Sequence, residues 1–301
     1  MREAGAGDKL LVGLVGAGIA RSLSPSMHEA EARAQGLALH YQLIDLDRSG
    51  AGVEALPVLL SAARTMGFAG LNITYPCKRA VIPLLDELSD DARAMGAVNT
   101  VVLRHGAVVG HNTDGPGWAW GFRRTLPNAD LSRVVLLGAG GAGSAIAHAA
   151  LRLGTRQLVV FDRDAERAHE AADGLACRWG KSSVRAATDL AEAMAGATGL
   201  VHATPTGMDK LPGMPLPESL LRPEMWVAEV VYFPLETELL RAARARGCAT
   251  VDGGTMAVGQ AVGAFELFTG RQADAARMEA HFRRLVAARA AAAADAAPAE
   301  A

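Results

Sequence analysis

Lys78 stands where a lysine could take part in proton transfer. It lies in "GLNITYPCKRAV", residues 70–81, an apolar run that ends in Thr74, Tyr75 and Pro76 before the lysine. Lysine can pass a proton to or from a reacting oxygen when its surroundings adjust its pKa. A proline that starts a helix would equally place Lys78 on an exposed face, where most lysines are solvated charges. The stretch by itself leaves both interpretations open.

A carboxylate follows in "GHNTDGPG", residues 110–117. Asp114 precedes a helical pattern, and an aspartate at that place usually caps the helix. The same carboxylate would raise the pKa of a neighbouring lysine, whereas burial would lower it. The sequence does not decide which effect is larger. Asp114 is therefore a candidate partner of Lys78 as well as a candidate cap.

Two serines follow a glycine-rich turn near the start of the chain. The turn has Gly13, Gly16 and Gly18 but lacks the third glycine of a dinucleotide motif, and Pro25 delays the next helix. This favours a substrate site over a phosphate cradle. The hydroxyls of Ser22 and Ser24 could hold a substrate there, or could simply cap the helix.

A complete glycine motif lies in "RVVLLGAGGAGSAIAHAALRLG", residues 133–154. Gly138, Gly140 and Gly143 have G-x-G-x-x-G spacing, after an apolar strand and at the start of a helix. The first glycine permits a tight turn, the second lets a pyrophosphate approach the backbone, and the third lets helix and strand pack closely. The motif in this context predicts dinucleotide binding.

The next strand, "RQLVVFD", ends at Asp162, 19 residues after Gly143. An acid at this place can bind the ribose hydroxyls of the adenosine, and it repels the extra phosphate of NADP. We therefore expect NAD to be preferred. Arg163 and Arg167 lie close behind and could partly restore NADP binding, so NADP is disfavoured but possible.

Strand-length apolar runs alternate with helical patterns, which predicts an α/β protein with a largely parallel sheet. Residues 9–16, 40–47 and 69–74 indicate strands, and residues 53–67 a helix closed by a glycine. Residues 97–113 indicate two short strands around a turn at 104–106. "TLPNADLS", residues 125–132, is the best boundary that composition offers. The alanine-rich segment 291–301 is expected to be a disordered tail.

Composition narrows the function classes. The 301 residues are 50% hydrophobic, enough for two domains with sizeable cores, and the formal net charge is −2. Such a charge gives no basic surface for nucleic acid or an anionic membrane. Three scattered cysteines and eight histidines without metal-ligand spacing indicate no disulfide framework and no metal site. The start of the chain lacks a secretory signal pattern. We expect a cytoplasmic protein whose partners are small molecules.

Eight short motifs along the chain together resemble those of a known enzyme family. "SLSPSMHEAEA", "NITYPCK", "GAVNTV", "GHNTDGPG", "GAGGAG", "ATPTGM", "EVVYFP" and "DGGTMAVGQA" occur in the order seen in shikimate dehydrogenases and their quinate/shikimate relatives, from about Leu11 to Gly270. The resemblance implies a substrate-binding catalytic domain over 9–113 with 254–290, and a Rossmann-type NAD(P) domain over 114–253, with the active-site cleft between them.

The resemblance also implies roles for residues. Lys78 and Asp114 match the catalytic pair. The substrate-binding positions are matched by Ser22, Ser24, Asn72, Thr74, Asn99, Tyr232 and Gln260. The cofactor-binding positions are matched by Gly138, Gly140, Gly141, Ala142, Gly143, Asp162, Arg163, Thr204, Pro205 and Gly254.

Some positions depart from the family pattern. His202 stands where many relatives have asparagine, and we expect a loop histidine without a catalytic role. Glu229 replaces an aspartate and is expected to shift an interdomain contact. "FDR" at 161–163 replaces a basic stretch of NADP-using members, which agrees with the argument from Asp162. Ser24 before Pro25 favours shikimate, whereas "HEAEA" favours the quinate/shikimate branch, so the choice of substrate stays open.

The expected function is an NAD-dependent oxidoreductase that interconverts shikimate or quinate and its 3-dehydro form, in aromatic amino acid biosynthesis or quinate metabolism. A monomer or homodimer is expected. Two alternatives stay open. One is a dehydrogenase acting on another small acid, such as aminoshikimate, or a folate-type dehydrogenase. The other is a sensor that binds the ligand and the dinucleotide without turnover.

Overall fold

The computed structural model describes residues 9–104 and 106–295, and the chain divides into two compact units. Among the described residues, the first unit comprises residues 9–92, 98–113 except 105, and 261–295. The second comprises Arg93–Ala97 and Asp114–Gln260. The second unit is thus almost a single insertion into the first. Residues 125–132, where composition suggested a boundary, lie inside the second unit, because the helix before them packs within that unit.

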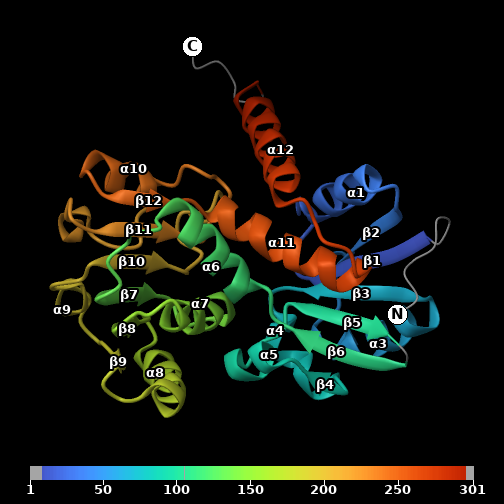
Figure 1. The fold of residues 1–301 in the computed structure, drawn as a ribbon, viewed down its shortest axis with the longest axis horizontal. Coiled ribbons are helices and arrows are strands. Elements are labelled where there is room, and N and C mark those ends of the chain that lie inside the picture. Colours follow the sequence, from blue (N-terminus) through green and yellow to red (C-terminus); the bar gives the residue numbers. More distant parts are fainter. Residues whose placement is uncertain (1–8, 105, 296–301) are drawn as a thin grey trace. The chain divides into compact units, whose positions relative to one another are not determined.

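The first unit is built on a mixed six-stranded sheet with strand order β2-β1-β3-β5-β6-β4 (Figure 1). Strand β1 pairs in parallel with β2 and β3, whereas β5 is antiparallel to both β3 and β6. The two short strands expected around the turn at 104–106 are β5 and β6. The strand bounds are β1 (Lys9–Gly16), β2 (Ala38–Asp45), β3 (Phe68–Ile73), β4 (Glu87–Leu88), β5 (Thr100–Arg104) and β6 (Ala107–His111).

Helices and 3₁₀ turns cover this sheet. The helix expected over 53–67 is a 3₁₀ turn that continues into α3, which ends just before Gly67 at a φ of +75°. Such a positive φ favours glycine and ends the helix. The bounds are α1 (Ser24–Ala34), α2 (Leu46–Ser49), η1 (Val53–Ala55), α3 (Leu56–Thr65), α4 (Cys77–Ala80), η2 (Ile82–Leu84), α5 (Asp90–Met95), α11 (Gly253–Thr269) and α12 (Ala275–Asp295). Helices α5 and α11 each have residues in both units.

The C-terminal helices complete the core of the first unit. Phe265 and Phe268 of α11 are fully buried among residues of β1, β2 and the chain near α1. Helix α12 packs against α1 and is tied to it by Arg277, which bonds both carboxylate oxygens of buried Glu31 at 2.7 Å. Helix α12 continues to Asp295, into the segment assigned to a disordered tail, because alanine is the strongest helix former. Residues 296–301 lie outside the described residues.

The second unit is a parallel six-stranded sheet with strand order β12-β11-β10-β7-β8-β9 (Figure 1). Counted from β7, this is the doubly wound order 3-2-1-4-5-6. Its elements are α6 (Asp114–Thr125), β7 (Arg133–Leu137), α7 (Gly141–Arg152), β8 (Gln157–Phe161), α8 (Ala165–Trp179), β9 (Val184–Ala186), α9 (Leu190–Met194), β10 (Gly199–His202), η3 (Glu218–Leu220), β11 (Trp226–Glu229), α10 (Glu238–Ala245) and β12 (Ala249–Val251).

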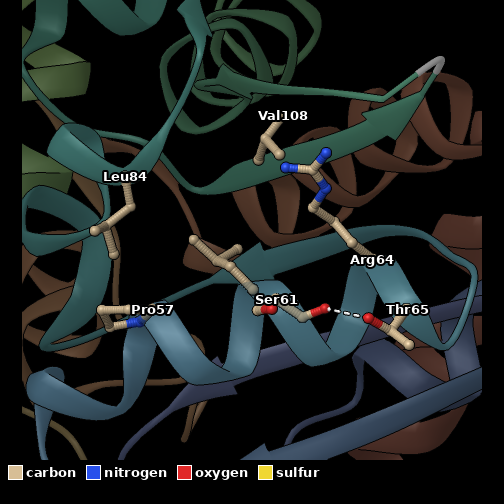
Figure 2. Close-up of a pocket in the computed structure, with 7 residues that line it drawn as sticks. Pro57, Ser61, Arg64, Thr65, Leu84 and Val108 are labelled. Carbon is tan, nitrogen blue, oxygen red and sulfur yellow. Dashed lines mark hydrogen bonds between the residues drawn. The ribbon is translucent and has the colours of Figure 1, made fainter.

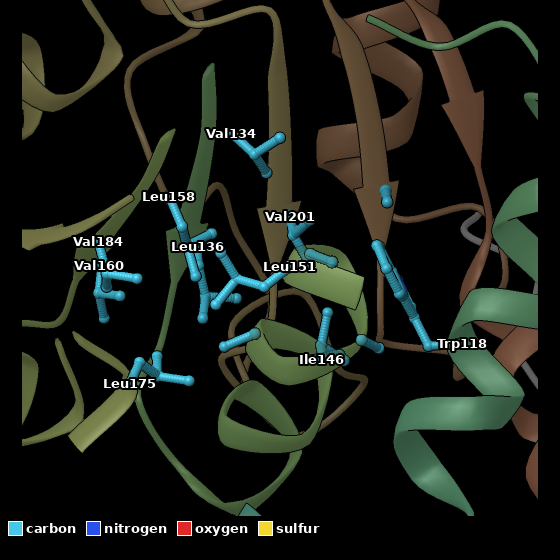
Figure 3. Close-up of a cluster of buried hydrophobic side chains, with 14 of the residues drawn as sticks. Trp118, Val134, Leu136, Ile146, Leu151, Leu158, Val160, Leu175, Val184 and Val201 are labelled. Atoms are coloured by element: carbon cyan, nitrogen blue, oxygen red, sulfur yellow. The ribbon is translucent and has the colours of Figure 1, made fainter. Parts of the chain in front are cut away.

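Strands of this sheet are apolar on both faces. Val134 and Leu136 of β7 pack with residues of α6, α7 and α8, among them Trp118 and Ile146 (Figure 3). The intervening Val135 and Leu137 pack on the opposite face with residues of α9 and α10. Successive side chains of a strand point to opposite faces, so a strand buried on both sides appears as the continuous apolar run seen in the sequence.

No helix among residues 9–104 and 106–295 is both long enough and apolar enough to cross a lipid bilayer.

Candidate active site

A buried hydrogen-bond network surrounds Asn99 in the first unit. Its Oδ1 accepts from the backbone N–H of Thr113 at 2.8 Å, and its Nδ2 donates to Thr113 Oγ1 at 2.9 Å. Thr100 Oγ1 donates to the same Oδ1 at 3.0 Å. Asn99 is 3% exposed. The residue before Asp114 is therefore fixed to the start of β5 by the Asn99 side chain.

Asn72 of β3 belongs to the same network. Its Nδ2 donates to the carbonyl of Asn99 at 3.2 Å and to Thr100 Oγ1 at 3.0 Å, and its Oδ1 accepts from the hydroxyl of Tyr41 at 2.8 Å. Both amide hydrogens are thus used inside the protein. Tyr41 was not among the predicted site residues, although a tyrosine among the apolar residues of a strand signals a buried hydroxyl that needs a partner.

Lys78 is the second residue of α4, two residues after Pro76. Its side chain is half-buried, and its carbonyl accepts from Val98 N at 2.9 Å. Val98 is the neighbour of Asn99, which holds Thr113. Lys78 and Thr113 are therefore both hydrogen-bonded to residues 98–99 within the first unit. Asp114 is 5% exposed and is itself the first residue of α6, where the positive end of the helix dipole favours a carboxylate.

The turn after β1 packs on the segment before Lys78. A Cβ on Gly16 would lie 2.3 Å from Thr74 Cγ2, and Thr74 N donates to the carbonyl of Val15 at 2.9 Å. The carboxylate of Asp45 accepts from the backbone amides of Gly18 and Ile19 at 3.0 and 3.1 Å. These two amides are thus already bonded to a side chain of the protein, which agrees with the expectation that the turn does not hold a phosphate.

Ser22 and Ser24 lie at the start of α1, after that turn. Their hydroxyls are 3.2 Å apart, and Ser22 Oγ also accepts from Ser24 N at 3.2 Å. The N-cap position itself is Leu23, which makes no side-chain cap bond. Both serines are partly exposed. Thr74 is also partly exposed, and the turn between β1 and Ser22 packs on it at Gly16. The hydroxyls of Ser22, Ser24 and Thr74 therefore belong to one region of the first unit.

The glycine loop of the second unit gives each glycine a separate role. Gly138 has a φ of +101°, and a Cβ there would meet the carbonyl of Ala203 at 2.8 Å. A Cβ on Gly143 would lie 2.0 Å from the Gly138 carbonyl oxygen. Gly140, the N-cap of α7, has open space where a Cβ would be. Gly141 and Ala142 form the first turn of α7. The open N-terminus beside Gly140 suits a pyrophosphate.

Asp162 follows β8 and is bonded to the glycine loop. Its Oδ2 accepts from Ala139 N at 2.9 Å and its Oδ1 from Asp164 N at 3.0 Å. The carboxylate thus helps to shape the loop, which motif reasoning did not anticipate. Arg163 is exposed, and Arg167 pairs with Asp164 at 3.4 Å. This exposed ion pair contributes little to stability. It nevertheless holds the Arg167 guanidinium beside Asp164, the N-cap residue of the same helix.

The remaining assigned residues lie on loops and on α11. Tyr232 is 37% exposed, with its ring centroid 5.4 Å from that of Phe233. Gln260 donates to the carbonyl of Ala257 at 3.1 Å, and Gly254 is buried in the first turn of α11. Pro205 is exposed, and Thr204 is half-buried.

A separate pocket of about 340 Å³ opens beside α3 in the first unit (Figure 2). It is lined by Pro57, Leu60, Ser61, Arg64, Thr65, Leu84 and Val108, and Arg64 donates to the carbonyl of Gly106 at 2.9 Å. None of the candidate site residues lines it. In the described part of the chain, no group of three or more His, Cys, Asp or Glu side chains could hold a metal ion.

Comparison with known proteins decides the family. Residues 14–101 match the shikimate dehydrogenase substrate binding domain, and residues 253–281 match the shikimate 5'-dehydrogenase C-terminal domain. The chain is 58% identical over 280 residues to "Shikimate dehydrogenase (NADP(+))" of Streptomyces avermitilis, which covers 92% of this chain and 96% of the relative. The chain belongs to the shikimate dehydrogenase family.

Relatives within the shikimate dehydrogenase family differ in their named cofactor and substrate. "Quinate/shikimate dehydrogenase (NAD(+))" of Corynebacterium efficiens is 49% identical, over 91% of this chain and 98% of the relative. A solved structure, quinate dehydrogenase from Corynebacterium glutamicum in complex with NAD, has a TM-score of 0.87 and 47% identity, and covers 92% of this chain and 100% of that one.

Two departures from the shikimate dehydrogenase pattern have a structural explanation. His202 is the last residue of β10, not a loop residue, and its side chain is fully buried with Nδ1 2.9 Å from Glu229 Oε1. The expectation of a loop histidine is therefore wrong, because a polar ring can be buried in a strand when both nitrogens find partners. Glu229 ends β11, is 1% exposed, and makes its bonds within the second unit.

Proposed function

We propose that the protein is a nicotinamide-dependent dehydrogenase that interconverts shikimate or quinate and its 3-dehydro form. The first unit would bind the substrate and the second the dinucleotide. One observation carries the proposal: a G-x-G-x-x-G loop with open space at Gly140 occurs in the same chain as residues 98–99, which hydrogen-bond to Lys78 and to Thr113, the residue before Asp114. The names of the family relatives support it.

Lys78 and Asp114 would carry the acid–base chemistry. When bound, a nicotinamide accepts or supplies the hydride, so the protein must handle the proton of the substrate hydroxyl. Lys78 would donate that proton during ketone reduction and remove it during alcohol oxidation. Asp114 would be the second member of this pair and would orient the ammonium group for the transfer.

The substrate carboxylate would lie near Ser22 and Ser24, whose hydroxyls are partly exposed and can donate hydrogen bonds. Thr74, Asn99, Tyr232 and Gln260 would contact the ring hydroxyls. Because both Nδ2 hydrogens of Asn72 are bonded inside the protein, we assign Asn72 the task of orienting Asn99 and Thr100.

NAD is proposed as the preferred cofactor, although family relatives include both NADP and NAD enzymes. The carboxylate of Asp162 is held at the end of β8 by two backbone amides, where it would meet the adenosine ribose. A 2'-phosphate at that place would be repelled. We expect a higher kcat/KM with NAD than with NADP, and Asp162→Ala should narrow the difference. A higher kcat/KM with NADP in the unaltered protein would contradict this preference.

The test of the function is a side-by-side assay of NAD reduction with shikimate, quinate and an aminated analogue. At least one acid should be turned over, and Lys78→Ala should lower kcat by about a hundredfold or more, since general acid–base catalysis contributes that much. Arg79→Ala removes the neighbouring exposed charge of the same helix and should change kcat little. Tight NAD binding without turnover of any of the three acids would contradict the proposed function.

A further inference from the structure

His202 and Glu229 form a buried chain of hydrogen bonds at the ends of β10 and β11. Glu229 Oε1 accepts from Val230 N at 2.8 Å and Val231 N at 2.9 Å, and lies 2.9 Å from His202 Nδ1. Its Oε2 accepts from Thr237 Oγ1 at 3.0 Å. Both side chains are 0% exposed. Removing one partner would leave a buried polar group unsatisfied.

The carboxylate sets the direction of the remaining bonds. A carboxylate only accepts, so Nδ1 of His202 carries the hydrogen, and in the neutral ring Nε2 is then an acceptor. Thr204 Oγ1 lies 2.5 Å from that Nε2 and is hydrogen-bonded to it. The same oxygen accepts from Thr206 N at 3.3 Å. The Thr204 hydroxyl is thus held between His202 and the backbone of Thr206.

Thr204 and its neighbour pack directly on the glycine loop. A Cβ on Gly138 would lie 2.8 Å from the Ala203 carbonyl oxygen and 2.9 Å from Thr204 Cγ2. Ala203 N donates to the carbonyl of Leu137 at 2.8 Å, and β10 pairs with β7 up to His202 and Leu137. A displacement of Thr204 would therefore move the turn at Gly138.

We propose that His202 and Glu229 are positioning residues for the dinucleotide. They fix Thr204 against Gly138, and thereby set the affinity of the second unit for a nicotinamide dinucleotide through Thr204. This inference rests on the proposed dinucleotide binding by the second unit.

The test measures the Kd of NADH by fluorescence titration of the full chain, together with the KM of the substrate acid. His202→Phe keeps a ring but removes both hydrogen bonds, and should raise the Kd for NADH about tenfold, the loss expected for one or two buried bonds. The KM of the acid should change less than about twofold. Thr204→Val should raise the Kd similarly. Since both variants break one chain, the double variant should show much less than the sum of the two effects.

The matched control is His148→Phe, the same substitution at another buried histidine of the second unit, whose ring bonds Trp179. It should leave the Kd for NADH unchanged even if it lowers the melting temperature. A wild-type Kd in His202→Phe would overturn the inference, as would equal rises in both histidine variants. If the unaltered protein does not bind NADH, the proposed dinucleotide function fails and the inference fails with it.

Discussion

The hydroxyl of Tyr41 donates a 2.8 Å hydrogen bond to the amide oxygen of Asn72, joining β2 to β3 in the interior of the first unit. Tyr41 is 3% exposed, so this bond is shielded from water. It fixes the amide orientation that sends both Asn72 hydrogens toward β5. A residue far from any loop thus orients the network around Asn99.

Tyr41→Phe should weaken substrate binding. Without the hydroxyl, Asn72 Oδ1 is left unsatisfied, which costs about 1–3 kcal/mol of stability and loosens Asn99. We expect the KM of the substrate acid to rise severalfold, with an unchanged Kd for NADH. Thr269→Val is the control, because it removes another buried hydroxyl of the first unit that bonds only within the segment 265–271. If Tyr41→Phe and Thr269→Val had a similar KM for the substrate acid, Tyr41 would have no particular role in orienting Asn72 and Asn99.

Gly140→Ala should lower the affinity for the dinucleotide, whereas Gly143→Ala should lower the stability of the protein. The added methyl at Gly140 meets open space, so the protein should fold with an unchanged melting temperature but lose dinucleotide affinity, because the methyl lies where the pyrophosphate approaches. The methyl at Gly143 would collide with the Gly138 carbonyl, so stability itself should fall. Gly174→Ala, also in open space but within α8, should raise stability by about 0.5–1 kcal/mol. Thermal melts and NADH titrations separate the three results.

His28 should make the first unit sensitive to acid. Burial lowers the pKa of His28 from 6.5 to about 3, and its ring lies 4.9 Å from that of Tyr41, with neither nitrogen hydrogen-bonded in the described structure. The unfolded chain binds a proton that the folded chain does not, so stability is full above pH 6.5 and falls as the pH drops toward 3. At pH 5 the expected loss is about 2 kcal/mol relative to pH 7.5.

The check is urea unfolding of the unaltered protein and of His28→Leu at both pH values. His28→Leu should remove most of the loss between pH 7.5 and pH 5. An identical pH dependence in the two proteins would show that His28 is not its source.

Substitution of Arg277 should lower the free energy of unfolding far more than substitution of other arginines of α12. Burial alone would raise the pKa of Glu31, but hydrogen bonds from Arg277, Asp274 N and Gln35 outweigh it and lower that pKa. The carboxylate therefore adds stability above its unfolded pKa of 4.5, and this is lost as the pH falls through the lower folded value. Arg277→Ala leaves the buried Glu31 carboxylate without its arginine partner, so the free energy of unfolding should fall by more than when a surface ion pair of this helix is removed.

Arg283→Ala is the comparison, since Arg283 has the same 41% exposure on the same helix and pairs with Glu279 at 3.4 Å one turn away. That pair should contribute about 0.5 kcal/mol or less. Equal unfolding free energies for the two variants would rule out the buried pair as the main attachment of α12.

Motifs with local causes could be predicted from the sequence. The glycine loop, the alternation of strands and helices, and the strand pair around residue 105 all follow from neighbouring residues, and the family resemblance is confirmed by comparison. The hydrogen-bond partners of His202, Asn72 and Asp162 could not be predicted. Each partner lies on a different strand or loop, and the sequence alone does not show which segments lie side by side. Composition suggested a unit boundary at residues 125–132, which form only a turn inside the second unit. Turns and boundaries between units are rich in the same polar residues, proline and glycine, so composition does not distinguish them.

The interrupted path of the chain has a consequence for synthesis on the ribosome. The second unit is nearly continuous, so it can finish folding once residue 260 has emerged. The first unit cannot, because Phe265 and Phe268 arrive only afterwards and lie 6.1 and 5.9 Å from the His28 ring. Until then the apolar side chains of β1 and β2 that pack against these two phenylalanines lack the residues that bury them.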